Sequence, residues 1–487
     1  MKKLLLLLVI GFCTINIFAA PKKLNVYISY CTFYSPQDGP YVETYLAYNG
    51  NSVNYQLNEN GLLQAKLEVL ILFKQNDSIK AFRKYNLHSP EMKDSLGFNM
   101  LFHDQQRISV PNGDYSMEIS IKDAYGTEPA IVIAEPVTID YKNKEIQISG
   151  IELLQSAEKA TTPSGSSKAG FDLLPLPLNI YPTSVSKLLF YAEMYNMLSI
   201  LGDSSKYLFR TYIEELQTSR KIPGLVFQKR LDSKNAEAII HEFEISTLPT
   251  GNYFLVLEIK DRENNLMASN RVFFERWNDS EQELAMVDDS YVAASFVSSM
   301  TQIDSLKEFI RSLRPISTEM EKVYVDNNMK TADVAALQRF FLNFWIQRNE
   351  ASPETAWIDY YKQVIKVNAN FSTRIRKGYE TDRGYVYLKY GEPNTITAVP
   401  HEPAAYPYEI WHYYKVMNQS NRKFIFCNAD LVTNDYELIH SDAIGEIYDS
   451  NWKSKLLKRN FTTNSLDEQK PDFGWGSKVD EYFSTPH

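Results

Sequence analysis

The chain has 487 residues, enough for about three domains, because a single hydrophobic core stops growing at roughly 250–300 residues. It carries 51 Lys and Arg against 60 Asp and Glu, a net charge of −9, and has no long basic run, which argues against nucleic acid as a partner. Tyr (32) and Phe (26) are each more abundant than Gly (19), which is typical of a β-rich protein with substantial cores and not of a disordered chain.

Residues 1–20 are predicted to form a secretory signal peptide. Lys2 and Lys3 provide a positive start, residues 4–12 form an apolar run, and Ala19 and Ala20 are small residues suited to cleavage by a signal peptidase. The run is too short to cross a hydrocarbon core of roughly 30 Å, which needs about 20 residues. No later stretch approaches that length without charges. We therefore expect an exported mature chain without a transmembrane segment.

A lipid anchor on Cys13 is the alternative for this leader. Such an anchor needs a small residue just before the cysteine, and Phe12 stands there, so we favour a cleaved and unlipidated leader. After cleavage only Cys31 and Cys427 remain. Because they lie in distant segments, we predict two separate buried thiols and no disulfide framework.

An internal repeat organises the first half of the chain. Residues 108–123 read ISVPNGDYSMEISIKD and residues 246–261 read STLPTGNYFLVLEIKD, with Pro, Gly, Tyr and Lys-Asp recurring at one offset (249 − 111 = 138). A period of this length indicates duplicated domains. In each copy a Pro-x-Gly turn precedes an alternating run that predicts a half-buried strand. The predicted inward residues are Tyr115, Met117, Ile119 and Ile121 in the first copy and Tyr253, Leu255, Leu257 and Ile259 in the second.

The repeat predicts a multidomain, mainly β protein that begins with two Ig-like β-sandwiches, at residues 22–150 and 173–277. Residues 161–170, TTPSGSSKAG, are rich in small polar side chains, so we predict a flexible linker over residues 151–172. Modules of this kind bind, space or orient other molecules, and the fold itself implies no chemistry.

The pattern changes to a helical period from about residue 281. Val334, Leu337, Phe341, Phe344 and Trp345 are spaced by three and four residues and form one apolar stripe; residues 356–367 continue in the same way. We predict a helical connector at residues 278–325 and expect both stripes to pack into a core.

Residues 378–394 read GYETDRGYVYLKYGEPN, which resembles the motif that names the GWxTD domain family, with Tyr379 in place of the tryptophan. EIWHYY at 409–414 and KFIFCN at 423–428 resemble the aromatic strands that follow in that family. The resemblance covers roughly residues 320–450. We therefore predict an α+β GWxTD domain at residues 326–460 and a C-terminal tail at 461–487. The resemblance implies an exported protein, of a kind common in the Bacteroidota, whose domain has no established activity.

The residues of this motif predict a corner between a helix and a strand. Gly378 is suited to a helix terminus, and Gly384 is suited to release the chain into a strand at residues 385–390. Asp382 is expected to accept hydrogen bonds from turn amides or to pair with Arg383 or Arg376. The alternative is that Glu380 and Asp382 are a paired acid and base, although their i, i+2 spacing does not establish that they converge.

Aromatic residues are concentrated at 406–414, and Trp475 stands in the tail. Exposed rings of this kind stack on sugars or receive partner side chains. Because side chains alternate along a strand, Trp411 and Tyr413 share one face, and Ile410, His412 and Tyr414 share the other. One face must be core. Our candidate binding residues are accordingly Glu380, Asp382, Arg383, Trp411 and Tyr413.

Signatures of catalysis are mostly missing from the sequence. The nearest candidate for a zinc site combines His401, Glu402, His412 and His440, but the sequence has neither HExxH nor a paired CxxC. No GxSxG elbow and no Gly-Lys-Ser/Thr phosphate loop occur either. We predict no catalytic residue, no metal and no cofactor, while a glycosidase with two distant carboxylates stays open.

Our leading hypothesis is a non-enzymatic cell-envelope interaction or scaffold protein, periplasmic or associated with the outer membrane. Its expected partners are other envelope proteins, including an outer-membrane complex. The alternative is a glycan-binding protein, or a hydrolase acting on glycan, that uses the C-terminal aromatic cluster. That alternative requires exposed rings at Trp411 or Tyr413.

Overall fold

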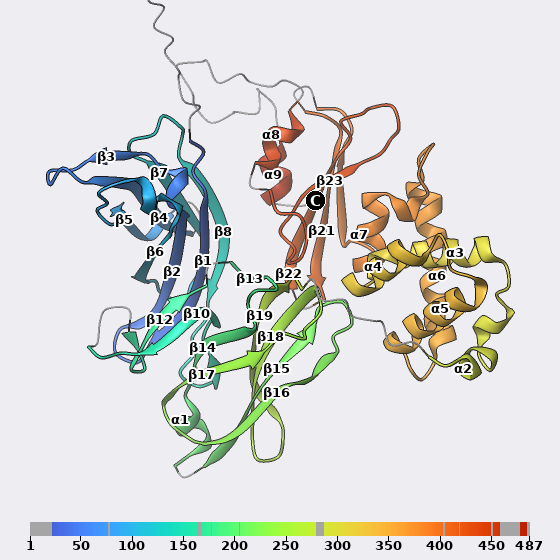
Figure 1. Cartoon of the computed structure of the whole chain (residues 1–487), viewed down its shortest axis with the longest axis horizontal. Coiled ribbons are helices and arrows are strands. Elements are labelled where there is room, and N and C mark those ends of the chain that lie inside the picture. Colours follow the sequence, from blue (N-terminus) through green and yellow to red (C-terminus); the bar gives the residue numbers. More distant parts are fainter. Residues whose placement is uncertain are drawn as a thin grey trace, which may run out of the picture. The chain divides into compact units, whose positions relative to one another are not determined.

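The computed structural model describes residues 22–75, 78–162, 167–176, 178–203, 205–278, 287–402, 405–417, 419–449, 451–457 and 478–484 (Figure 1). The predicted signal peptide and most of the predicted tail, including Trp475, lie outside these residues. The chain divides into two compact units, residues 1–141 and 142–487. No helix among the described residues has both the length and the apolar character needed to cross a membrane.

The first unit is a β-sandwich. Its smaller sheet has the order β1-β2-β6, from β1 (Val26–Ser35), β2 (Gly39–Asn49) and β6 (Leu101–Ser109). The larger sheet contains β3 (Tyr55–Leu57), β4 (Leu63–Gln75), β5 (Ser78–His88), β7 (Gly113–Asp123) and β8 (Ile131–Ile139). Short 3-10 turns are η1 (Gly50–Ser52) and η2 (Ser95–Asn99). Residues from both sheets, such as Val42, Val69 and Ile119, pack into one core.

The second unit begins with another β-sandwich. One sheet contains β9 (Gln147–Ile148), β10 (Glu152–Lys159), β11 (Ser167–Lys168), β12 (Phe171–Pro175), β14 (Lys187–Tyr195) and β17 (Ala236–Glu244). The other contains β13 (Ile180–Tyr181), β15 (Lys206–Glu215), β16 (Lys221–Asp232), β18 (Gly251–Lys260) and β19 (Leu266–Arg276); the helix α1 (Met197–Leu201) follows β14. Phe190, Phe209 and Leu255 lie in their shared core. The predicted fold class, mainly β with two sandwiches, is therefore confirmed.

The internal repeat has the same geometry in both sandwiches. The Tyr115 hydroxyl donates to the Pro111 carbonyl at 3.0 Å, and the Tyr253 hydroxyl donates to the Pro249 carbonyl at 3.1 Å. A tyrosine that bonds back to the backbone a few residues upstream is a recurring corner of Ig-like sandwiches. The predicted inward residues of β7 and β18 are all buried, which confirms the strand register.

The predicted flexible linker at 151–172 is wrong, because most of this segment is sheet. β10 pairs with both β12 and β14, and so belongs to the second sandwich. Lys168 and Glu152 form an ion pair at 2.7 Å with both side chains buried. The composition of residues 161–170 suggested a solvated linker. The described part of the predicted linker is ordered instead because β10 pairs with β14, which is distant in the sequence, and because Lys168 has a buried partner. Residues 163–166 lie outside the described chain.

Helices on both sides of residue 326 share one core. They are α2 (Asp289–Ala293), α3 (Ile303–Ser312), α4 (Glu319–Asn328), α5 (Val334–Arg348) and α6 (Pro353–Phe371), with the turns η3 (Phe296–Ser299) and η4 (Arg314–Ile316). Phe341 of α5 and Trp357 of α6 pack in this core, as the helical spacing predicted, and Leu306 of α3 joins them. Ile365, at the end of the second predicted stripe, is exposed instead. The predicted connector and the start of the next domain therefore form one helical layer.

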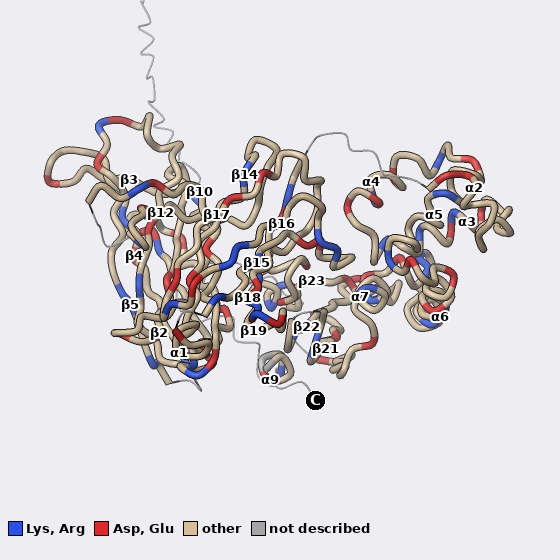
Figure 2. The backbone as a smooth tube through the Cα atoms, turned by 90° about the horizontal axis from the view of Figure 1, so that it is seen from below, with Lys and Arg blue, Asp and Glu red and all other residues tan. Residues whose placement is uncertain are grey.

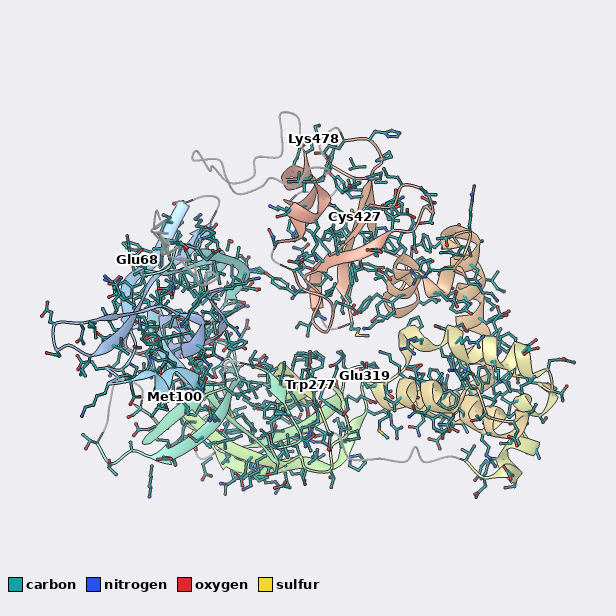
Figure 3. The ribbon with its side chains drawn as sticks, turned by 45° about the horizontal axis from the view of Figure 1, so that its top comes forward. Glu68, Met100, Trp277, Glu319, Cys427 and Lys478 are labelled. Carbon is teal, nitrogen blue, oxygen red and sulfur yellow. The ribbon has the colours of Figure 1, made fainter. Side chains whose placement is uncertain are left out.

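The C-terminal module is a four-stranded antiparallel sheet with helices on both faces (Figure 1). Its order is β20 (Thr395–Val399), β21 (Tyr408–Val416), β22 (Gln419–Cys427) and β23 (Glu437–Ser441). Helices α6 and α7 (Asp382–Tyr390) cover one face, while α8 (Trp452–Leu456) and α9 (Val479–Ser484) cover the other. Cys427, labelled in Figure 3, ends β22; it and Cys31 are both buried and unbridged, as predicted. Acidic and basic positions are interspersed along the described chain (Figure 2).

Candidate functional site

We define the motif segment as residues 377–391. It contains a turn and the helix α7, where a strand was predicted at 385–390. After the turn η5 (Gly378–Glu380), Thr381 caps α7: its hydroxyl accepts from the Gly384 amide at 3.1 Å and donates to the Gly378 carbonyl at 2.8 Å. Gly391 ends α7 with a φ of 86°, which favours glycine. The strand predicted at 385–390 is therefore wrong. The threonine N-cap favours the helix here, although the aromatic and β-branched residues of YVYLKY have a high strand propensity.

Two glycines of the motif segment are required by close backbone contacts. A Cβ added to Gly378 would lie 2.2 Å from the Val367 carbonyl oxygen of α6, and one added to Gly384 would lie 1.8 Å from the Gly378 carbonyl oxygen. No side chain fits at such distances. The motif segment thus allows the end of α6, η5 and the start of α7 to pack directly against one another through their backbones.

Asp382 and Arg383 join this corner to the sheet. The Asp382 Oδ2 atom accepts from the Leu438 amide of β23 at 2.8 Å. The buried Arg383 guanidinium donates to Glu409 Oε1 at 2.9 Å and to the Asn434 carbonyl at 3.1 Å. It also lies 4.2 Å from the ring centroid of Tyr436. One arginine therefore connects α7 to β21 and to the loop between β22 and β23.

Glu380 does not share partners with Asp382. Its Oε2 atom accepts from the Lys377 amide at 3.0 Å and so closes the start of η5. Arg376, the other predicted partner of Asp382, instead pairs with Asp435 at 2.9 Å. These contacts support the structural interpretation of the corner, and they give no support to a catalytic pair of carboxylates.

The aromatic cluster is core and not an exposed platform. Trp411 and Tyr413 are 0% and 1% exposed. The Trp411 Nε1 atom donates to Glu409 Oε2 at 2.9 Å, and the Tyr413 hydroxyl donates to the Gly391 carbonyl at 2.8 Å. Both rings are therefore fixed inside the domain, because α6 and α7 cover the face of the sheet on which they lie. The prediction of Trp411 and Tyr413 as binding residues is wrong, and the glycan-binding alternative that depended on them fails.

Glu409 is a residue that the sequence did not single out. Its two carboxylate oxygens accept separately from Arg383 and from Trp411, so it connects the motif to the aromatic core. Its side chain is only 14% exposed. The available signal was a carboxylate in a predicted strand, close to Trp411 in the sequence. Its partner Arg383 lies 26 residues earlier in the chain, so the sequence alone did not connect the two.

A second polar cluster, around Glu446, also escaped prediction. Glu446 Oε1 accepts from Lys389 Nζ at 2.6 Å, from the Tyr390 hydroxyl at 2.7 Å and from the Tyr385 hydroxyl at 3.1 Å. The side chains of Lys389 and Glu446 are each 6% exposed. Burial, followed by the charge of Glu446, raises the pKa of Tyr385 and of Tyr390 well above the usual range. Both phenols therefore stay protonated and serve as donors to one carboxylate.

The candidate metal ligands are separate and have other partners. Glu402 is buried and accepts from the Tyr408 hydroxyl at 2.8 Å. His412 contacts the side chain of Asn421, and His440 Nδ1 accepts from the Asp449 amide at 3.1 Å. Within the described ranges, no three or more His, Cys, Asp or Glu side chains form a group suited to a metal ion.

Residues 282–457 match a family model described as the GWxTD domain. The match starts before the predicted boundary at residue 326 and takes in the helical layer. No curated protein matches the chain.

Solved structures show only low similarity to the chain. A glycosyl hydrolase family 2 member from Bacteroides cellulosilyticus DSM 14838 is 8% identical with a TM-score of 0.19, covering 48% of this chain and 28% of that one. A putative beta-galactosidase from Bacteroides fragilis is 8% identical with a TM-score of 0.18, at coverages of 50% and 34%. The fibronectin(III)-like modules of Clostridium thermocellum CbhA are 10% identical with a TM-score of 0.15, at coverages of 50% and 90%. The chain spans about a third or less of the two hydrolases, and these scores carry no inference about activity.

Proposed function

Because this chain is a GWxTD domain-containing protein, we propose that it is a non-enzymatic interaction or scaffold protein of the cell envelope. The observation that carries the proposal is the internal use of the motif's polar groups. The Thr381 side chain caps α7, Asp382 bonds to β23 and Arg383 bonds to β21. Because Asp382 and Arg383 bond to the sheet, they stabilise the domain, and this supports a structural role for the motif over a catalytic one.

The modular architecture supports the same proposal. Two β-sandwiches precede the GWxTD domain, and modules of this type bind or space other molecules. The leader at residues 1–20 supports export, which would place the protein in the periplasm or at the outer membrane, with envelope proteins or an outer-membrane complex as partners.

The test is affinity purification of the full chain from detergent-solubilised envelopes after mild chemical cross-linking. We expect at least one envelope protein to co-purify in a fixed ratio, and the same protein to be recovered after a salt wash. A matched purification from cells that lack the tagged chain controls for background. Recovery of the chain alone, with or without cross-linker, would refute the proposal.

A further inference from the structure

We propose that the tip of the loop between β22 and β23, Leu431 and Val432, is the docking element of the GWxTD domain and inserts into an apolar pocket of a partner protein. This inference rests on the proposed function as an interaction protein. We define the docking loop as residues 428–436.

The tip exposes two adjacent apolar side chains. Leu431 is 58% exposed and Val432 is 74% exposed. Single exposed apolar residues are common on protein surfaces, so exposure alone does not mark a site. Here, however, Leu431 also has a φ of 61°, in the left-handed region that side-chain-bearing residues rarely adopt. Strained backbone persists where the surrounding structure enforces it, and it is concentrated at binding and switching segments.

The ascending arm of the docking loop is fixed by its own side chains. Asn428 Oδ1 accepts from the Leu431 amide at 3.0 Å, and Asp430 Oδ2 accepts from the Thr433 amide at 3.2 Å. The Thr433 hydroxyl donates to the same Asp430 oxygen. These bonds set the direction in which the tip is presented.

The descending arm is held by the motif segment and the turn before it. Arg383 donates to the Asn434 carbonyl at 3.1 Å, and Arg376 pairs with Asp435 at 2.9 Å. The Arg383 guanidinium also packs on the ring of Tyr436. Preorganising a loop in its bound conformation reduces the entropy lost on binding. The motif therefore has a consequence beyond stability, because it holds an apolar tip in one conformation.

Charge indicates the chemistry of the partner. Residues 428–437 contain Asp430, Asp435 and Glu437 but no Lys or Arg, and Arg376 neutralises Asp435. Asp430, which precedes the tip directly, and Glu437, which begins β23 at the base of the loop, are both exposed. The structure thus fits a protein pocket with an apolar floor and a basic rim. An anionic membrane surface would repel these carboxylates.

The experiment places a photo-activated cross-linking amino acid at position 432, or at the control position 323, in the full chain in intact cells. Val323 of α4 is 56% exposed and belongs to the same domain, so it matches Val432 in residue type and Leu431 in exposure. We expect a discrete protein adduct from position 432 that exceeds the adduct from position 323 at least fivefold. The adduct partner is identified by mass spectrometry and purified for direct binding.

In the binding assay, V432D and L431D are each expected to raise the Kd for the purified partner at least tenfold, and V323D to leave it within twofold. V432S provides a second variant with a smaller perturbation, and thermal melts check that each variant is folded. Equal adducts at both positions, adducts with lipid alone, or an unchanged Kd for V432D would overturn the docking loop. If a partner co-purifies with the chain but cross-links elsewhere, only this inference fails; if none co-purifies, the proposed function fails as well.

Discussion

Gly384→Ala is the substitution that most directly tests the backbone contact inside the motif segment. Gly384 is the third residue of α7, and in an exposed helix alanine is more favourable than glycine by about 1 kcal/mol. Helix propensity alone therefore predicts that G384A stabilises the domain. The structure predicts the opposite sign, because the new Cβ would lie 1.8 Å from the Gly378 carbonyl oxygen.

The magnitude follows from what the clash displaces. Relieving it moves the start of α7 away from η5, with an overpacking cost of about 1–3 kcal/mol. The same movement breaks the Thr381 cap, worth about 1 kcal/mol, and the bond from the Thr381 hydroxyl to the Gly378 carbonyl, worth about 1 kcal/mol. After the helix-propensity gain of about 1 kcal/mol is subtracted, a net loss of about 2–4 kcal/mol remains.

Hydrogen exchange followed by mass spectrometry measures this loss locally, which suits a chain with several domains. We expect amides of α7 and β23 to exchange at least 30-fold faster in G384A, while amides of β7 in the first sandwich keep their rates. Gly391→Ala is the control without a clash, since nothing lies within 4 Å of its added Cβ. Its φ of 86° and ψ of −167° lie in a region that is almost exclusive to glycine, so about 1–3 kcal/mol is expected there from the backbone alone. Unchanged or slower exchange of α7 in G384A would refute the close-contact explanation.

Three other substitutions or conditions test the remaining contacts. R383M leaves the Glu409 carboxylate without its ion pair and should lower the local stability of α7 and β21 by about 3–5 kcal/mol, measured by hydrogen exchange of their amides, with R383K in between; a loss under 1 kcal/mol would contradict the buried ion pair. Burial lowers the pKa of His440 from 6.5 to about 4, so the folded chain keeps this side chain neutral at pH values where the unfolded chain protonates it. The free energy of unfolding is therefore undiminished above pH 6.5 and falls as the pH drops from 6.5 through 4. That shift corresponds to about 3 kcal/mol in the free energy of unfolding. Because H440Q removes this titration, the acid midpoint of its unfolding should lie at lower pH. An unchanged midpoint would contradict a lowered pKa of His440. Burial raises the pKa of Cys427 to about 11, so iodoacetamide at pH 8 should label it at least 100-fold more slowly in the native chain than in urea, and comparable rates would show an accessible thiolate.

The strands of the repeat could be predicted because their information is local. Alternation after a Pro-x-Gly turn fixes which side chains face inward, and Tyr115 and Tyr253 then reach back to their turn carbonyls. The pairing of β10 with β14 depends instead on residues that are distant in the sequence, and composition alone made the segment resemble a linker. Local information was also conflicting at 385–390, where residues of high strand propensity follow a threonine N-cap.

The site was predicted less well than the fold because its contacts are long-range. Glu409 meets Arg383 across 26 residues, and Glu446 meets Tyr385 across 61. The burial of Trp411 depends on α6 and α7 covering its face of the sheet, which strand alternation does not reveal. Asp382 and Arg383 were predicted as binding residues, and the contacts that the structure shows for them hold the corner together.

Tyr379 stands where the family motif has a tryptophan, and its ring is buried. Tyr379 is 6% exposed and packs in the core that joins α6 and α7 to the sheet. Its backbone amide is bound by Asn368 Oδ1 at 3.2 Å, so the turn is fixed independently of the side chain. In this chain a large ring therefore fills the space between α6, α7 and the sheet. The glycines, the threonine cap and the arginine carry contacts that a substitute of another shape cannot reproduce. The motif is thus best understood as the set of residues that lets α6, α7 and the sheet meet at close range and holds the docking loop in place.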